Sequence, residues 1–131
     1  MFLKLFAVAL PLFLALDMTW LAFIARGYYR SQIGTLLKDD VNFVAAGIFY
    51  VIYIFGLVTF VLLPALEKKS WHSALLFGAF FGFVTYCTYD LTNLAIAKNW
   101  PLPVTIVDIA WGTVLAGVVS VLTYWIAVKI L

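Results

Sequence analysis

Apolar residues fill four long segments of the chain, and short stretches between them hold most of the charges. The segments cover approximately residues 3–25, 43–66, 71–97 and 103–128. Each is close to the roughly 20 apolar residues that a helix needs to cross a bilayer. Because lipid cannot pair exposed backbone groups, spanning segments of this kind form helices. The pattern predicts an all-α membrane protein, a four-transmembrane-helix bundle that makes residues 1–131 a single integral membrane domain.

Composition supports this class. The chain is 66% hydrophobic and 11% charged, with a mean hydropathy of +1.12, whereas a soluble domain is about half apolar and a quarter charged. A net charge of +2, spread along the chain, does not indicate a nucleic-acid partner. Cys87 is the single cysteine, so no intrachain disulfide can form.

The first segment could be mistaken for a secretory signal. It continues beyond Asp17 and has no convincing small-residue cleavage site, so we expect a retained helix. The one long connection, residues 26–42, contains Ile33, Leu36 and Leu37, which predict a short helix on the membrane surface. The candidate caps for the second span are Asp39, Asp40 and Asn42.

Four spans place both termini on one side of the membrane. The basic residues divide evenly between the two sides. Lys4, Lys68, Lys69 and Lys129 lie on the terminal side, and Arg26, Arg30, Lys38 and Lys98 lie on the other. The N-terminal amine breaks this tie and favours cytoplasmic termini under the positive-inside rule.

Three aspartates, Asp17, Asp90 and Asp108, lie inside these spans. An aspartate at the centre of a membrane helix costs about 2.5–3.5 kcal/mol on insertion scales, and such residues usually mark a function. Counting along the helices at 1.5 Å per residue puts all three roughly 5–10 Å from the midplane, in the same half of the bilayer. Their common depth predicts one cluster.

Helical spacing adds neighbours to this cluster. Asp90 shares an arc of its helix with two tyrosines and an asparagine, Asp108 shares a face with Trp111, and a Gly78-x-x-x-Gly82 spacing would let another helix approach closely. Two tyrosines of the second span reach a similar depth. The candidate ligand-binding residues are Asp17, Tyr50, Tyr53, Tyr86, Tyr89, Asp90, Asn93, Asp108 and Trp111.

Three motifs carry a family resemblance: Asp17-x-x-Trp20, the string Tyr89-Asp90-Leu91-Thr92-Asn93, and Asp108-x-x-Trp111-Gly112. In this order over four spans, the chain resembles the Domain of Unknown Function 2177 family of small bacterial membrane proteins. The resemblance covers nearly the whole chain and implies the four-span architecture, the choice of site residues and a bacterial inner-membrane location. It implies no reaction.

Three functions fit these observations. A buried acidic site with aromatic neighbours is typical of a protein that binds or transports a small cationic or amphipathic ligand. The layout is similar to that of the small multidrug-resistance transporters, although those have a single acid. Carboxylates also serve lipid-modifying enzymes, but the patterns of intramembrane aspartyl proteases and headgroup phosphotransferases are absent. The third alternative is an accessory subunit whose polar cluster only fixes helix register. We expect no metal and no cofactor, the bilayer and a cationic or lipid ligand as partners, and leave a homo-oligomer open.

Overall fold

The computed structural model describes residues 1–36 and 42–130, and all of its regular elements in these ranges are helical. Four helices are long and apolar enough to cross a membrane: Phe2–Ile24, Phe43–Glu67, Trp71–Ile96 and Leu102–Ile130. Every end lies within two residues of the sequence-based prediction. The four-helix membrane architecture is therefore confirmed.

Two of the spans contain a wider, π-helical turn. The first consists of α1 (Phe2–Thr19) and the π segment η1 (Trp20–Ile24), and the second of α3 (Phe43–Leu57), the π segment η3 (Val58–Leu62) and α4 (Leu63–Glu67). The third and fourth spans are the uninterrupted helices α5 (Trp71–Ile96) and α6 (Leu102–Ile130). η3 ends at Leu62, two residues before Pro64, whose ring would meet the carbonyl four residues earlier in a regular α-helix.

The connection after the first span folds back as α2 (Arg26–Ile33) and the 3₁₀ turn η2 (Gly34–Leu36). A short helix is present here, as predicted, but it begins before Ile33 and packs against the bundle. Tyr29 and Ile33 are buried, and Leu36 is exposed. The predicted Leu37, Lys38, Asp39 and Asp40 lie outside the described residues.

Side-chain caps fix the starts of two spans. The side chain of Asn42 accepts a hydrogen bond from the backbone N–H of Ala45 at 3.0 Å, as expected of a cap for α3. Ser70 accepts one from the N–H of Ser73 at 3.1 Å and begins α5. The turn before it requires a left-handed residue, Lys69, with φ 54°.

Small residues bring α5 and α6 together along most of their length. A Cβ added at Gly78 would lie 3.0 Å from the carbonyl oxygen of Ala116, and one added at Gly82 would lie 2.7 Å from the Cβ of the same residue. At Gly112, an added Cβ would run into the ring of Tyr86. Close backbone approach through small residues is the usual means of packing membrane helices, and it fixes α5 and α6 as a pair.

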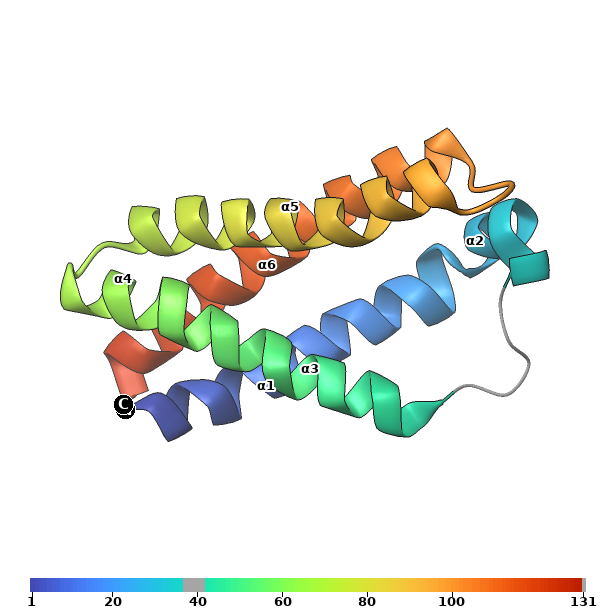
Figure 1. Ribbon diagram of the computed structural model, residues 1–131. Coiled ribbons are helices and arrows are strands. Elements are labelled where there is room, and N and C mark those ends of the chain that lie inside the picture. Colours follow the sequence, from blue (N-terminus) through green and yellow to red (C-terminus); the bar gives the residue numbers. More distant parts are fainter. Residues whose placement is uncertain (37–41, 131) are drawn as a thin grey trace.

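The other two spans pack unevenly against this pair. The first lies against α6, α3 and η3, whereas α5 meets the second span mainly through η3 and α4. Figure 1 shows both termini at one end of the bundle and α2 at the other, beside the start of α6. Towards the α2 end, α3 diverges from α5, and this divergence makes room for the site described next.

Candidate functional site

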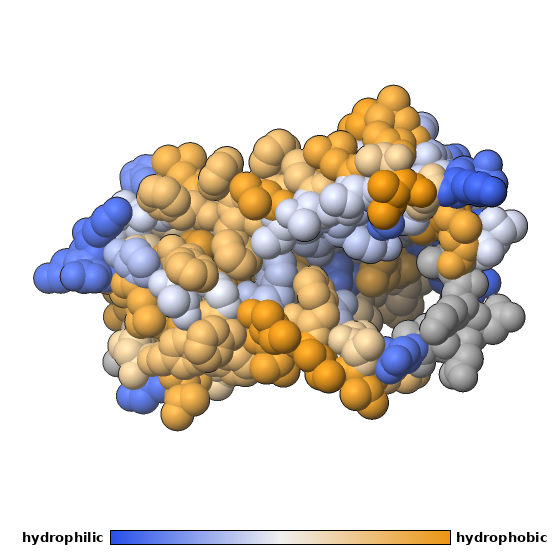
Figure 2. Space-filling view, in the orientation of Figure 1, coloured by the Kyte–Doolittle hydropathy of each residue, from blue (hydrophilic) through white to orange (hydrophobic). Residues whose placement is uncertain are grey.

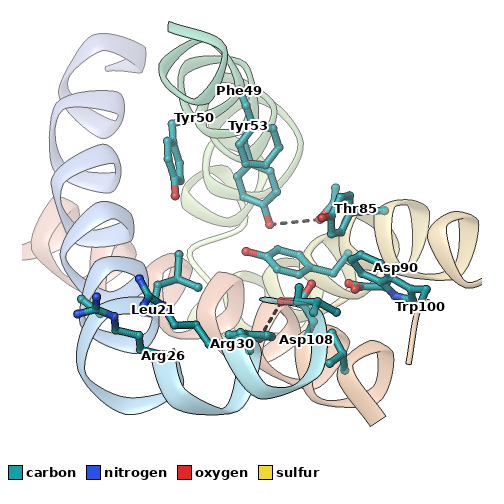
Figure 3. A pocket seen from close by; sticks show the side chains of 16 residues that line it. Leu21, Arg26, Arg30, Phe49, Tyr50, Tyr53, Thr85, Asp90, Trp100 and Asp108 are labelled. Atoms are coloured by element: carbon teal, nitrogen blue, oxygen red, sulfur yellow. Dashed lines mark hydrogen bonds between the residues drawn. The ribbon is translucent and has the colours of Figure 1, made fainter. Parts of the chain in front are cut away.

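A cavity of about 770 Å³ lies at the α2 end of the bundle. All four spans and α2 line it, and we call it the central cavity (Figure 3). The space-filling view shows a hollow between the two long helices nearest the viewer, with apolar residues along its rim and hydrophilic colour inside (Figure 2). Small-molecule sites in proteins have volumes of about 300–1,000 Å³, so the central cavity has the size of a ligand site.

Asp90 is the most unusual residue of the central cavity. It is 0% exposed, yet neither carboxylate oxygen has a hydrogen-bond partner among the described residues. It lies six residues before the end of α5, about 9 Å along the helix axis. A buried charge without a partner is strongly unfavourable, so this carboxyl group is expected either to be protonated, with the neighbouring Asp108 as acceptor, or to meet a cation.

Asp108 lines the same cavity from α6 and is held by α2. The hydroxyl of Tyr29 donates a hydrogen bond to Asp108 Oδ1 at 3.0 Å, and Trp20 Nε1 donates one to the Tyr29 hydroxyl at 3.2 Å. Burial raises the pKa of Tyr29, and the nearby Asp108 carboxylate adds to that effect. The Tyr29 hydroxyl therefore keeps its proton and acts as a donor.

Asp17 occupies a different environment. It is 6% exposed and accepts two hydrogen bonds, from the Tyr50 hydroxyl at 2.8 Å and from Trp111 Nε1 at 3.1 Å. The Trp111 ring stacks on Trp20, with centroids 4.5 Å apart and planes 7° apart. Asp17 is thus enclosed by side chains of three spans, and it does not line the central cavity.

The remaining predicted residues divide in the same way. Tyr53, Tyr86 and Tyr89 line the central cavity together with Tyr50. Tyr53 accepts a hydrogen bond from Thr85 at 3.3 Å, whereas Asn93 is half-buried and is not part of the lining. Of the nine predicted residues, the cavity brings together Tyr50, Tyr53, Tyr86, Tyr89, Asp90 and Asp108. Their role in binding a ligand remains a prediction.

Several lining residues were not predicted as part of the site, and three of them are polar residues of the loop after the first span. Arg26, Tyr29 and Arg30 all come from α2. In the sequence, the two arginines bear only on the orientation in the membrane. Ala25, Tyr29 and Ile33 recur every four residues and are all buried, so an apolar stripe in the loop was the signal that this segment packs against the bundle.

The π segment η1 follows Asp17 by three residues and supplies both Trp20 and Leu21 to this region. Its wider turn is closed by the N–H of Ala25, which donates to the carbonyl of Trp20 at 2.7 Å. Such turns occur frequently at functional sites. Within residues 1–36 and 42–130, no three His, Cys, Asp or Glu side chains are grouped so as to hold a metal ion.

The fold and the cavity define a small multi-pass membrane protein with a polar site between its helices. The chain belongs to the family described as "Predicted membrane protein (DUF2177)", whose sequence profile matches residues 2–125. This match confirms the resemblance found from the three aspartate motifs. No curated protein and no solved structure matches the chain.

Proposed function

We propose that this protein binds a small cationic or amphipathic molecule in the central cavity and transports it through the membrane. The single observation that carries the proposal is Asp90, a fully buried carboxylate in a cavity of ligand size with no hydrogen-bond partner among the described residues. A cationic group next to Asp90 would supply the missing positive charge, and a protonated amine would supply donors as well.

Electrostatics favours a cation over a neutral or anionic ligand. Asp90 and Asp108 both line the central cavity (Figure 3), and two like charges in a medium of low dielectric repel each other strongly. A cation between them would reduce that repulsion. Protonation would do the same, so exchange of a proton for the ligand is the mechanism that we propose for transport.

The apolar part of the ligand would contact aromatic rings. Tyr53, Tyr86 and Tyr89 line the central cavity beside Phe49, and such rings pack against apolar groups and attract cations through their faces. Phe49 is 50% exposed and Tyr89 is 56% exposed. Both belong to membrane spans, where exposed side chains face lipid. An amphipathic molecule could therefore reach the cavity from the bilayer.

Contrast with Asp17 argues against a purely structural role for Asp90. A carboxylate that only fixes helix register should have its oxygens paired, as those of Asp17 are by Tyr50 and Trp111. Asp90 has no such pairing in the described chain. The structural account therefore fits Asp17, and the ligand account fits Asp90.

For the location, we propose the bacterial inner membrane with both termini in the cytoplasm. The family match supports a membrane protein, and the orientation rests on the N-terminal amine, which adds one positive charge to an otherwise equal distribution.

The test is to measure, by isothermal titration calorimetry, how tightly the purified protein in detergent binds tetraphenylphosphonium. We expect Asp90→Asn to weaken binding at least about tenfold, because loss of a close charge in a desolvated site costs about 2–5 kcal/mol. Glu67→Gln is the matched control, since it removes one carboxylate at the opposite end of the bundle. Equal binding by the parent protein and by Asp90→Asn would refute the proposal.

A further inference from the structure

The central cavity carries charges of both signs. Asp90 and Asp108 line it from α5 and α6, and Arg26 and Arg30 line it from α2. The hydrogen bonds that Asp17 and Asp108 accept come from Tyr50, Trp111 and Tyr29, and Asp90 accepts none within the described residues. The arginines are therefore not used to neutralise the aspartates, and each pair is left to interact with a ligand.

From this arrangement we infer that the ligand is a zwitterionic aminophospholipid, with its phosphate at Arg26 and Arg30 and its primary ammonium at Asp90 and Asp108. The inference rests on the proposed function and names the class of molecule that the same site would take.

The positions of the charges suit such a headgroup. α2 lies at the end of the bundle, and Asp90 and Asp108 each lie six residues inside the ends of their helices, about 9 Å of helix length. Arg26 and Arg30 are one helical turn apart and both are exposed, so they can turn to the same phosphate. Guanidinium groups bind phosphate oxygens in pairs, and their long stems can reach part of the way inward.

A primary ammonium fits Asp90 better than a trimethylated one. Both oxygens of Asp90 lack donors in the described chain, and a primary ammonium offers three N–H donors, whereas a trimethylammonium offers none. The inference therefore predicts phosphatidylethanolamine as the preferred lipid, ahead of phosphatidylcholine.

The acyl chains would leave the cavity between α3 and α5. These helices diverge towards the α2 end (Figure 1), and Phe49 on α3 and Tyr89 on α5 line the cavity while remaining at least half exposed. Leu21 and Ile33 add apolar lining near the arginines. A headgroup could enter through this opening while its chains stay in the hydrocarbon of the bilayer.

The experiment is native mass spectrometry of the delipidated protein in detergent, titrated separately with phosphatidylethanolamine, phosphatidylcholine, phosphatidylglycerol and soluble phosphoethanolamine. Tetraphenylphosphonium binding is measured on the same samples by calorimetry. The variants are Asp90→Asn, the double variant Arg26→Gln/Arg30→Gln, and the matched control Lys68→Gln/Lys69→Gln, which removes two positive charges at the other end. Measurement in detergent makes the orientation of membrane insertion irrelevant.

We expect phosphatidylethanolamine to bind at least about fivefold more tightly than the other two lipids. Asp90→Asn and the double arginine variant should each weaken it at least about tenfold, and the lysine control should not. Tetraphenylphosphonium, which has no phosphate, should be bound more weakly by Asp90→Asn but should not be bound more weakly by the double arginine variant.

Three results would overturn the inference. If tetraphenylphosphonium depends on Asp90 but phosphatidylethanolamine shows no preference or no dependence on the arginines, the cation site stands and the zwitterionic ligand is wrong. If soluble phosphoethanolamine binds as tightly as the lipid, the ligand is a soluble zwitterion and the opening between α3 and α5 plays no part. If neither ligand responds to Asp90→Asn in a protein that melts normally, the proposed function fails together with the inference.

Discussion

Trp111 donates a hydrogen bond from its indole Nε1 to Oδ1 of Asp17 at 3.1 Å, joining the fourth span to the first across 94 residues of sequence. The Tyr50 hydroxyl completes the pairing from the second span. Three helices are thereby tied together at one carboxylate, beside a cavity whose own carboxylate, Asp90, is left without a partner in the described chain. The two aspartates are expected to respond differently to substitution.

For the Asp17 network, Trp111→Phe should destabilise the protein by about 1–2 kcal/mol. The substitution keeps an aromatic ring against Trp20 but removes a donor to a buried carboxylate. Tyr50→Phe should have an effect of similar size. Circular dichroism of unfolding in detergent measures both changes, and a double-mutant cycle with Asp17→Leu, which removes the acceptor, should show coupling of about 0.5 kcal/mol or more. Additive effects would mean that the hydrogen bonds contribute nothing.

At Asp90, both Asn and Leu should be tolerated by the fold. Because no described group bonds to this carboxylate, its replacement leaves no donor unpaired and removes an unfavourable buried charge. Melting temperatures of Asp90→Asn and Asp90→Leu should equal or exceed that of the parent protein, while tetraphenylphosphonium binding is lost. A severe loss of stability in Asp90→Leu alone would instead assign Asp90 to a structural network.

Close packing of α5 on α6 gives a prediction at Gly112. A Cβ there would enter the ring of Tyr86, so Gly112→Val should destabilise the bundle by about 1–3 kcal/mol or more through overpacking. Gly47→Ala is the control, since nothing lies within 4 Å of a Cβ built at that position of α3. It should be neutral or slightly stabilising in a thermal melt. A harmless Gly112→Val would contradict the close contact.

Binding of a cation should depend on pH with a definite sign. Protonation removes the negative charge of a carboxylate, so tetraphenylphosphonium affinity should fall as pH is lowered and recover when it is raised. The pH dependence should be much weaker in Asp90→Asn, which has one titrating group fewer. Calorimetric titrations over a pH series would measure both, and a pH profile unchanged by the substitution would assign the proton to another group.

Topology can be tested with the native cysteine removed by Cys87→Ala. Lys68 lies in the turn between the second and third spans, and Lys98 in the turn between the third and fourth. Lys68→Cys and Lys98→Cys should therefore react with a membrane-impermeant maleimide from opposite faces of the membrane. Labelling of both from one face of intact cells would contradict the four-span arrangement.

The spans could be predicted from sequence to within two residues at each end. Their length and apolarity are local properties, and the bilayer permits few alternatives to a helix. A common depth for Asp17, Asp90 and Asp108 could also be predicted, because distance along a helix follows directly from residue count; that depth stays a prediction. The family could also be inferred from sequence, since its motifs are short strings at fixed places in the spans.

Depth alone did not reveal which aspartate would be paired. That difference depends on how the spans pack: Asp17 meets Tyr50 and Trp111, whereas Asp90 lines the cavity at the end where α3 diverges from α5. The apolar stripe of the loop indicates packing against the bundle, but the contact of Tyr29 with Asp108, 79 residues away in sequence, exists only when α2 folds back onto the bundle. Helix formation in a membrane is decided by the residues of each segment. The partners of a buried side chain are decided by how separate segments pack, and that is a property of the tertiary structure.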